Sequence, residues 1–298
     1  MSNITPAKLA IYYSYPSSVN ATFTVGGAAN VFKDYNQVVF GAGLEENTHP
    51  DHQNTIDIIN DSVMANTEVY GYIDATLALD TIQNKIDKWY NMGVSGIFMD
   101  RFGYDFNVSR QKQREIVWSI HEKGDNTLKA FVNAWNPDDV FSPNVDATHN
   151  PNGLVTRLGA NDWYLAESFT VINGQYDDAD VDNNGIKDWQ DKAAKLVNYR
   201  TTYGTKIAAT TTYDNTAFDQ NKMDYAYFAS VMNNFDAFSF GEENFASVSA
   251  QLPFRTRKNF FGNNFVGSVV INGNTYYRYT NIGITINTNA HTVDTLIE

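Results

Sequence analysis

Residues 68–100 read EVYGYIDATLALDTIQNKIDKWYNMGVSGIFMD and contain one complete strand–helix–strand unit. The first stretch, EVYGYID, and the last, SGIFMD, are short and apolar, which is typical of strands that are buried on both faces. Between them, Ile82 and Ile86 recur at helical spacing, and Gly93 is placed to end the helix. The pattern predicts two parallel strands joined by a helix.

The same alternation continues along the chain from residue 8, and it gives eight such units. A second clear helix is predicted between an N-cap at Ser109 and a stop at Gly124. Because no glycine-rich phosphate turn follows the first strand, an open dinucleotide-binding sheet is disfavoured. We therefore predict an α/β fold, a (β/α)8 TIM barrel over residues 1–250. Its strands are expected at 9–15, 37–43, 68–74, 95–100, 128–134, 163–169, 206–213 and 236–242.

The character of the sequence changes after residue 250. The segment FVGSVVINGNTYYRYTNIGITINTN alternates polar and apolar residues and is broken at Asn272-Gly273, which is a strong hairpin signal. Its second half also resembles the terminal strands of barrel proteins of the glycosidase type. We expect residues 251–298 to form a small C-terminal β-strand appendage.

Composition excludes several classes of function. The 298 residues are 43% hydrophobic and include no cysteine, so a large core is available, whereas disulfides and thiolate sites are not. The formal net charge of −13 argues against nucleic acid as a partner and favours a neutral or cationic substrate. No run approaches the roughly 20 apolar residues of a membrane span, so no membrane insertion is expected. No signal peptide is visible at the start.

Polar side chains gather where the predicted strands end, which is the rim that carries the active site in barrel enzymes. A carboxylate at the end of a buried strand is costly unless it is hydrogen-bonded or functional, so Asp100 and Glu167 are the leading catalytic candidates. Aromatic rings at the same rim suit sugar rings. The substrate-binding candidates are Tyr13, Tyr15, Tyr72, Asp74, Arg101, Asn133, Trp135, Tyr213 and Glu242, and the rim also carries Glu45, Tyr164, Asp214 and Glu243.

Hydrolysis of a glycosidic bond typically uses two carboxylates that flank the scissile bond, one ionised and one protonated. Asp100 and Glu167 could face each other across the barrel mouth in this way. In the alternative interpretation they are structural: Asp100 pairs with Arg101 or a nearby lysine, and Glu167 caps a turn.

A family resemblance supports the catalytic interpretation. The stretch from residue 68 to 105 resembles the spherulin-4 family and the related endo-α-1,4-polygalactosaminidases of glycoside hydrolase family 114, with weaker support from LKAFVNAWNP and WYLAESF. The resemblance implies that Asp100 is the catalytic Asp of strand four and Glu167 the catalytic Glu of strand six. It also implies cleavage of an α-linked amino-sugar or galactose-type polymer, with Asp74 in a supporting role. The first strand, Glu45 and the arginine after Asp100 depart from the family pattern.

The segment DVDNNGIKDWQD, residues 180–191, has the oxygen-ligand spacing of an EF-hand calcium loop, with Gly185 at the sharp turn. It resembles the DxDxDGxxD loops of dockerins and thrombospondin type 3 repeats. So many carboxylates in one turn repel each other unless a cation gathers them. We expect a structural Ca²⁺, the alternative being a solvated acidic loop. The predicted ligands are Asp180, Asp182, Asn184, Ile186 through its carbonyl, Asp188 and Asp191.

Two functions remain open from the sequence. The first is a retaining glycoside hydrolase with Asp100 as nucleophile and Glu167 as acid/base. The second is a non-catalytic barrel that binds a polysaccharide or cell-surface glycan, or a structural part of a phage tail or cell-surface assembly. Either function is compatible with an extracellular or virion-associated protein.

Overall fold

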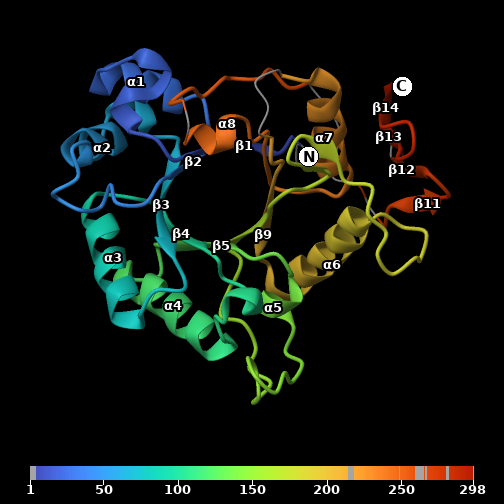
Figure 1. Ribbon diagram of the computed structural model, residues 1–298, viewed down its shortest axis with the longest axis horizontal. Helices are drawn as coiled ribbons and strands as arrows, with labels where there is room; N and C mark the ends of the chain where they lie inside the picture. The colour runs from blue at the N-terminus through green and yellow to red at the C-terminus, as the bar shows by residue number, and fades with distance from the viewer. Residues whose placement is uncertain are drawn as a thin grey trace.

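The computed structural model describes residues 5–213, 218–247, 249–258, 265, 267–279 and 282–297. Eight parallel strands close into a barrel in the order β1-β10-β9-β6-β5-β4-β3-β2, and helices surround it (Figure 1). The predicted (β/α)8 barrel is therefore confirmed. Its strands are β1 (Ala7–Tyr12), β2 (Gln37–Phe40), β3 (Glu68–Asp74), β4 (Gly96–Asp100), β5 (Lys129–Asn133), β6 (Trp163–Ala166), β9 (Lys206–Thr210) and β10 (Ala237–Ser239).

The helices follow the predicted alternation, although two of them are single turns. The predicted helix caps are confirmed in α4, where the Ser109 hydroxyl accepts the Lys112 N–H and Gly124 is the C-cap residue. In α3 the C-cap is Met92, and Gly93 follows it with φ +92°. The α-helices are α1 (Val25–Phe32), α2 (His52–Ile59), α3 (Leu79–Asn91), α4 (Arg110–Lys123), α5 (Asp138–Phe141), α6 (Asp188–Tyr203), α7 (Gln220–Met232) and α8 (Glu243–Ala246); the 3₁₀ turns are η1 (Pro16–Ala21), η2 (Ser62–Met64) and η3 (Tyr104–Phe106).

Two apolar layers stabilise the barrel, because successive residues of a strand point to opposite faces. The outer layer lies between strands and helices, and it includes Tyr164, whose ring packs on Phe141. The inner layer fills the barrel, as expected for a barrel of this size. Its buried members are Leu9, Ile11, Val39, Tyr70, Phe98, Phe131, Trp163, Leu165, Ala208 and Ala237.

The C-terminal appendage is a four-stranded antiparallel sheet with the order β11-β12-β13-β14 (Figure 1). Its strands are β11 (Val270–Asn272), β12 (Thr275–Tyr279), β13 (Ile282–Asn287) and β14 (Thr292–Ile297). The buried Arg278 guanidinium ties the sheet to α7 by donating to the Met232 carbonyl at 2.6 Å. The first part of the predicted appendage behaves differently, because residues 251–258 run along the barrel and Arg257 donates to the carbonyl of Pro6 at 2.7 Å. The domain division at residue 250 stays a prediction.

Candidate active site

Alternation along the strands brings one polar layer above the inner apolar layer. Phe98 and Phe131 point into the barrel, so Asp100 and Asn133, two residues further on, point inward as well. Strand β6 ends at Ala166, and Glu167 continues the inward series of Trp163 and Leu165. Side chains from three neighbouring strands thus meet at the carboxyl end of the barrel.

Asn133 connects the two predicted catalytic carboxylates. Its side-chain nitrogen donates one hydrogen bond to Asp100 Oδ1 at 2.9 Å and another to Glu167 Oε2 at 2.7 Å. Those two carboxylate oxygens cannot lie farther apart than the sum of these distances. The sequence predicts Asn133 as a substrate-binding residue, which stays a prediction; its side-chain nitrogen is bound to both carboxylates.

Asp100 has hydrogen-bond donors on both oxygens. The Tyr72 hydroxyl donates to Oδ2 at 2.7 Å, and the Asn133 amide occupies Oδ1. Among the described residues, no lysine or arginine forms an ion pair with Asp100; Arg101 pairs instead with Asp74, at 3.3 Å. The alternative in which Arg101 neutralises Asp100 is therefore wrong.

Glu167 lies in a different environment. Burial raises the pKa of its carboxyl group, and the charge of Asp100 raises it further, whereas the Asn133 hydrogen bond and the positive charge of Lys192 lower it. The net direction is upward, so Glu167 retains its proton to a higher pH than an exposed glutamate. A buried carboxyl group with a raised pKa is suited to donate a proton as a general acid.

Each carboxylate is followed by a residue with left-handed backbone. Arg101, after Asp100, has φ 56°, and Ser168, after Glu167, has φ 55°. Neither residue is glycine, so each position stores backbone strain of the kind that concentrates at functional sites. The Ser168 hydroxyl shares a hydrogen bond with Thr212 at 2.9 Å, which helps to hold the turn.

Two tyrosine rings, Tyr13 and Tyr72, lie beside the carboxylates at the carboxyl end of the barrel. Tyr13 packs edge-on against Tyr72, with 5.6 Å between ring centroids, and against Phe245 at 5.8 Å. Burial raises the pKa of the Tyr13 hydroxyl well above its usual range, and the charges of Asp100 and Glu167 raise it further. Burial also raises the pKa of the Tyr72 hydroxyl, so Tyr13 and Tyr72 are neutral rings beside the two carboxylates; their binding of sugar stays a prediction.

A cleft of about 640 Å³ opens beside Glu167. Trp135 is 57% exposed in this cleft, and the Lys192 ammonium lies 4.8 Å from the centroid of its indole ring. Burial lowers the pKa of Lys192 to about 8. Lys192 was not predicted, because it lies on α6 and not at a strand end. The other lining residues are Asn136, Pro137, Ser168, Phe169, Ile172, Asp177, Ala179, Val181, Asp182, Asp188, Trp189, Asp191 and Lys195.

Two other substrate-binding candidates, Tyr15 and Tyr213, do not line this cleft. Tyr15 is 47% exposed, and its ring packs edge-on against His49. Tyr213 is buried with its ring against Phe240. Among the other rim residues, Tyr164 is buried in the outer layer, and its hydroxyl donates to the carbonyl of Ala134. Glu45 is buried and paired with Lys85. Asp214 and the Glu243 side chain lie outside the described part of the structure.

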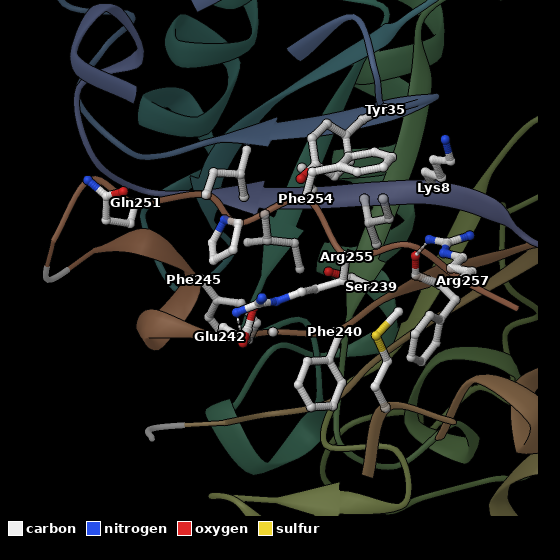
Figure 2. A pocket seen from close by; sticks show the side chains of 18 residues that line it. Lys8, Tyr35, Ser239, Phe240, Glu242, Phe245, Gln251, Phe254, Arg255 and Arg257 are labelled. Atoms are coloured by element: carbon white, nitrogen blue, oxygen red, sulfur yellow. Dashed lines mark hydrogen bonds and ion pairs between the residues drawn. The ribbon is translucent and has the colours of Figure 1, made fainter. Parts of the chain in front are cut away.

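Glu242 belongs to a separate pocket, which Figure 2 shows between β1, β10 and residues 251–257. Arg255 donates to both Glu242 oxygens, at 2.9 and 3.0 Å, and its guanidinium lies 4.0 Å from the centroid of Phe218. The pocket holds only about 50 Å³ and does not include Asp100 or Glu167. This bidentate pair leaves Glu242 committed to Arg255.

The acidic loop predicted to bind calcium turns at a glycine and leads into α6. Gly185 has φ +82°, and α6 begins at Asp188, whose carboxylate accepts the Val181 N–H at 3.0 Å. The Asn184 amide donates to Asp182 at 3.1 Å and to Asp191 at 2.9 Å. The donor set is all oxygen, which fits Ca²⁺. Within the described ranges, however, no three His, Cys, Asp or Glu side chains already converge as a metal-binding group.

Comparison with known proteins gives similar structures but no family, so the residues of the site carry the argument about function. No model of a protein family matches the sequence, and no curated protein does either. Solved structures that share the barrel include Rhizobium etli pyruvate carboxylase, at 11% identity and a TM-score of 0.43 over 78% of this chain and 22% of that one. Haloferax volcanii malate synthase is 12% identical, with a TM-score of 0.46 over 86% and 78% of the two chains. The chain spans about a fifth of the length of the first of these proteins. No described helix is both long and apolar enough to cross a bilayer.

Proposed function

We propose that the protein is a retaining glycoside hydrolase that acts on an α-linked amino-sugar or galactose-type polymer. The observation that carries this proposal is the Asn133 amide bound to both Asp100 and Glu167. Retaining enzymes hold their two carboxyl groups about 5–5.5 Å apart, whereas inverting enzymes leave about 6.5–9.5 Å for a water. The two hydrogen bonds, of 2.9 and 2.7 Å, favour the shorter separation.

The surroundings of the two carboxylates suggest which is the nucleophile and which is the acid/base. Asp100, whose two oxygens accept hydrogen bonds from Tyr72 and Asn133, is the nucleophile that attacks the anomeric carbon and forms a glycosyl ester. Glu167, whose pKa is raised by burial, donates its proton to the glycosidic oxygen as the leaving group departs. Glu167 then takes a proton from the water that hydrolyses the ester, which restores both carboxyl groups.

Aromatic rings beside the carboxylates provide the binding surface in this proposal. Trp135 offers an exposed ring at the cleft, and Tyr13 and Tyr72 lie next to Asp100. Flat rings with polar edges pack against the apolar faces of sugars. The α linkage and the polymer class rest on the resemblance of residues 68–105 to the polygalactosaminidases.

The test is hydrolysis of α-1,4-linked galactosaminan and α-1,4-linked galactan, followed by the release of reducing ends. We expect cleavage of at least one polymer, and proton NMR of the first product should show the α anomer. Binding without release of reducing ends would replace this proposal with a non-catalytic glycan-binding barrel. A β-anomeric product would contradict the assignment of Asp100 as nucleophile.

We also propose that the loop at 180–191 binds a structural Ca²⁺. The side chains that would hold it are Asp180, Asp182, Asn184 and Asp191, together with the Ile186 carbonyl, while Asp188 secures the start of α6. When bound, the ion would neutralise the repulsion among these carboxylates and fix the wall of the cleft beside Lys192.

A further inference from the structure

The acidic residues that line the cleft beside Glu167 all have hydrogen-bond partners within the protein. Each carboxylate has a hydrogen-bond donor: Asp177 accepts the Ala179 N–H at 3.1 Å, and Asp188 accepts the Val181 N–H. Asp182 and Asp191 both accept from the Asn184 amide. These neutral donors hold the carboxylates in place without cancelling their charge, and the only positive side chains among the described lining residues are Lys192 and Lys195.

The two lysines of the cleft differ in whether they form an ion pair. Lys195 is exposed and pairs with Asp138 at 2.8 Å. Lys192 is half-buried and forms no ion pair with any described residue. Its ammonium lies over the face of Trp135, and the charges of Glu167 and Asp177 act on it from beyond ion-pair distance. Partial burial of an unpaired ammonium is unfavourable unless an anion compensates for the lost water.

We propose that Lys192 is a specificity-determining residue that binds an anionic substituent, such as a sugar carboxylate, on the glycan that occupies this cleft. This inference rests on the proposed function in taking the ligand to be a glycan, and it narrows the substrate to polymers of the galactose type that carry acid groups. The Lys192 ammonium lies 4.8 Å from the centroid of the Trp135 ring, so a sugar that binds beside this ring lies near the ammonium.

The ligands for the test are a tetrasaccharide of α-1,4-linked galacturonic acid and its methyl ester, which has the same rings without the charges. Calorimetric titration of the Asp100→Asn variant measures binding without turnover. We expect the acid to bind about tenfold more tightly than the ester, which is the effect of one charge-assisted hydrogen bond. The variant that also carries Lys192→Met should lose this difference, because methionine keeps the apolar stem and removes the charge.

Lys195→Met is the matched control, since Lys195 lines the same cleft one turn further along α6 and already has a partner. It should leave the preference for the acid unchanged. Equal binding of acid and ester, loss of both affinities together on Lys192→Met, or no binding of either ligand would overturn the proposal. The result does not depend on hydrolysis: a preference for the acid in a protein that cleaves no polymer would retain the binding role and remove only the proposed enzyme activity.

Discussion

Arg101 and Asp74 form an ion pair across the ends of β4 and β3, with 3.3 Å between Arg101 Nη1 and Asp74 Oδ2. Arg101 is 52% exposed at its side chain and also lies 5.6 Å from the Phe106 ring. Its partner is therefore not Asp100, the residue that precedes it. The two oxygens of Asp100 are bound instead by the neutral groups of Tyr72 and Asn133.

Arg101→Gln should accordingly have little effect on hydrolysis, within about threefold in kcat, because an exposed pair contributes little. Tyr72→Phe removes a hydrogen bond to a charged carboxylate, which contributes about 1.5–3 kcal/mol, and should lower kcat by about 10- to 100-fold. Steady-state kinetics of the two variants provide the comparison. A larger loss from Arg101→Gln than from Tyr72→Phe would show that Arg101 acts on the nucleophile.

Asp100→Asn and Glu167→Gln should each lower kcat by at least about 100-fold, because each removes one of the two groups that the chemistry needs. Asp105→Asn is the control, an exposed acid in the same loop after β4. Reducing-end assays with matched circular dichroism spectra separate loss of chemistry from loss of fold. Wild-type rates in either variant would remove that carboxylate from the mechanism.

Glu167→Gln should also change the pH dependence of stability. The folded pKa of Glu167 is raised, so its contribution to the free energy of unfolding is complete below the unfolded pKa, about 4.3, and is lost as pH rises through the folded value. Glutamine stays neutral throughout. Relative to the wild type, the variant should therefore become more stable as pH increases. Urea unfolding across this range measures the difference; one that is constant with pH would contradict the raised pKa.

Removal of calcium should lower the melting temperature of the protein, since an ion that binds only the folded state stabilises it by mass action. Addition of excess Ca²⁺ after chelation should restore it. Asp180→Asn should make melting insensitive to chelator, because Asp180 occupies the first ligand position. Asp57→Asn, on the exposed face of α2, should leave the response intact. An identical melting curve with and without chelator in the wild type would exclude the ion.

Glu242→Gln should affect stability rather than catalysis. It breaks the bidentate pair with Arg255, a mostly buried interaction that holds residues 251–258 against β1 and β10. We expect a loss of about 1–2 kcal/mol in the free energy of unfolding, with KM unchanged. Chemical denaturation measures the free energy of unfolding, and kinetics over a range of substrate concentrations measure KM. A raised KM at unchanged stability would return Glu242 to the substrate-binding residues.

Strand ends show where prediction from the sequence was accurate and where it was not. All eight strands were predicted, but β6 ends at Ala166 and not at residue 169, and β9 ends at Thr210 and not at residue 213. An apolar run continues beyond the last ladder hydrogen bond, because loop residues are also buried at the barrel mouth. Tyr213 was therefore placed at the rim, although its side chain is buried beside Phe240.

The sequence by itself determined the eight βα units and the inward direction of Asp100, because strand alternation and helical spacing are local properties of the chain. Only the tertiary structure decided which groups bind each other. The Asn133 bridge, the Arg101–Asp74 pair and the position of Lys192 beside Trp135 all join residues that are distant in sequence or lie on different elements. Such contacts depend on the stagger of neighbouring strands and on where each loop returns, and neither is encoded in a short window of residues.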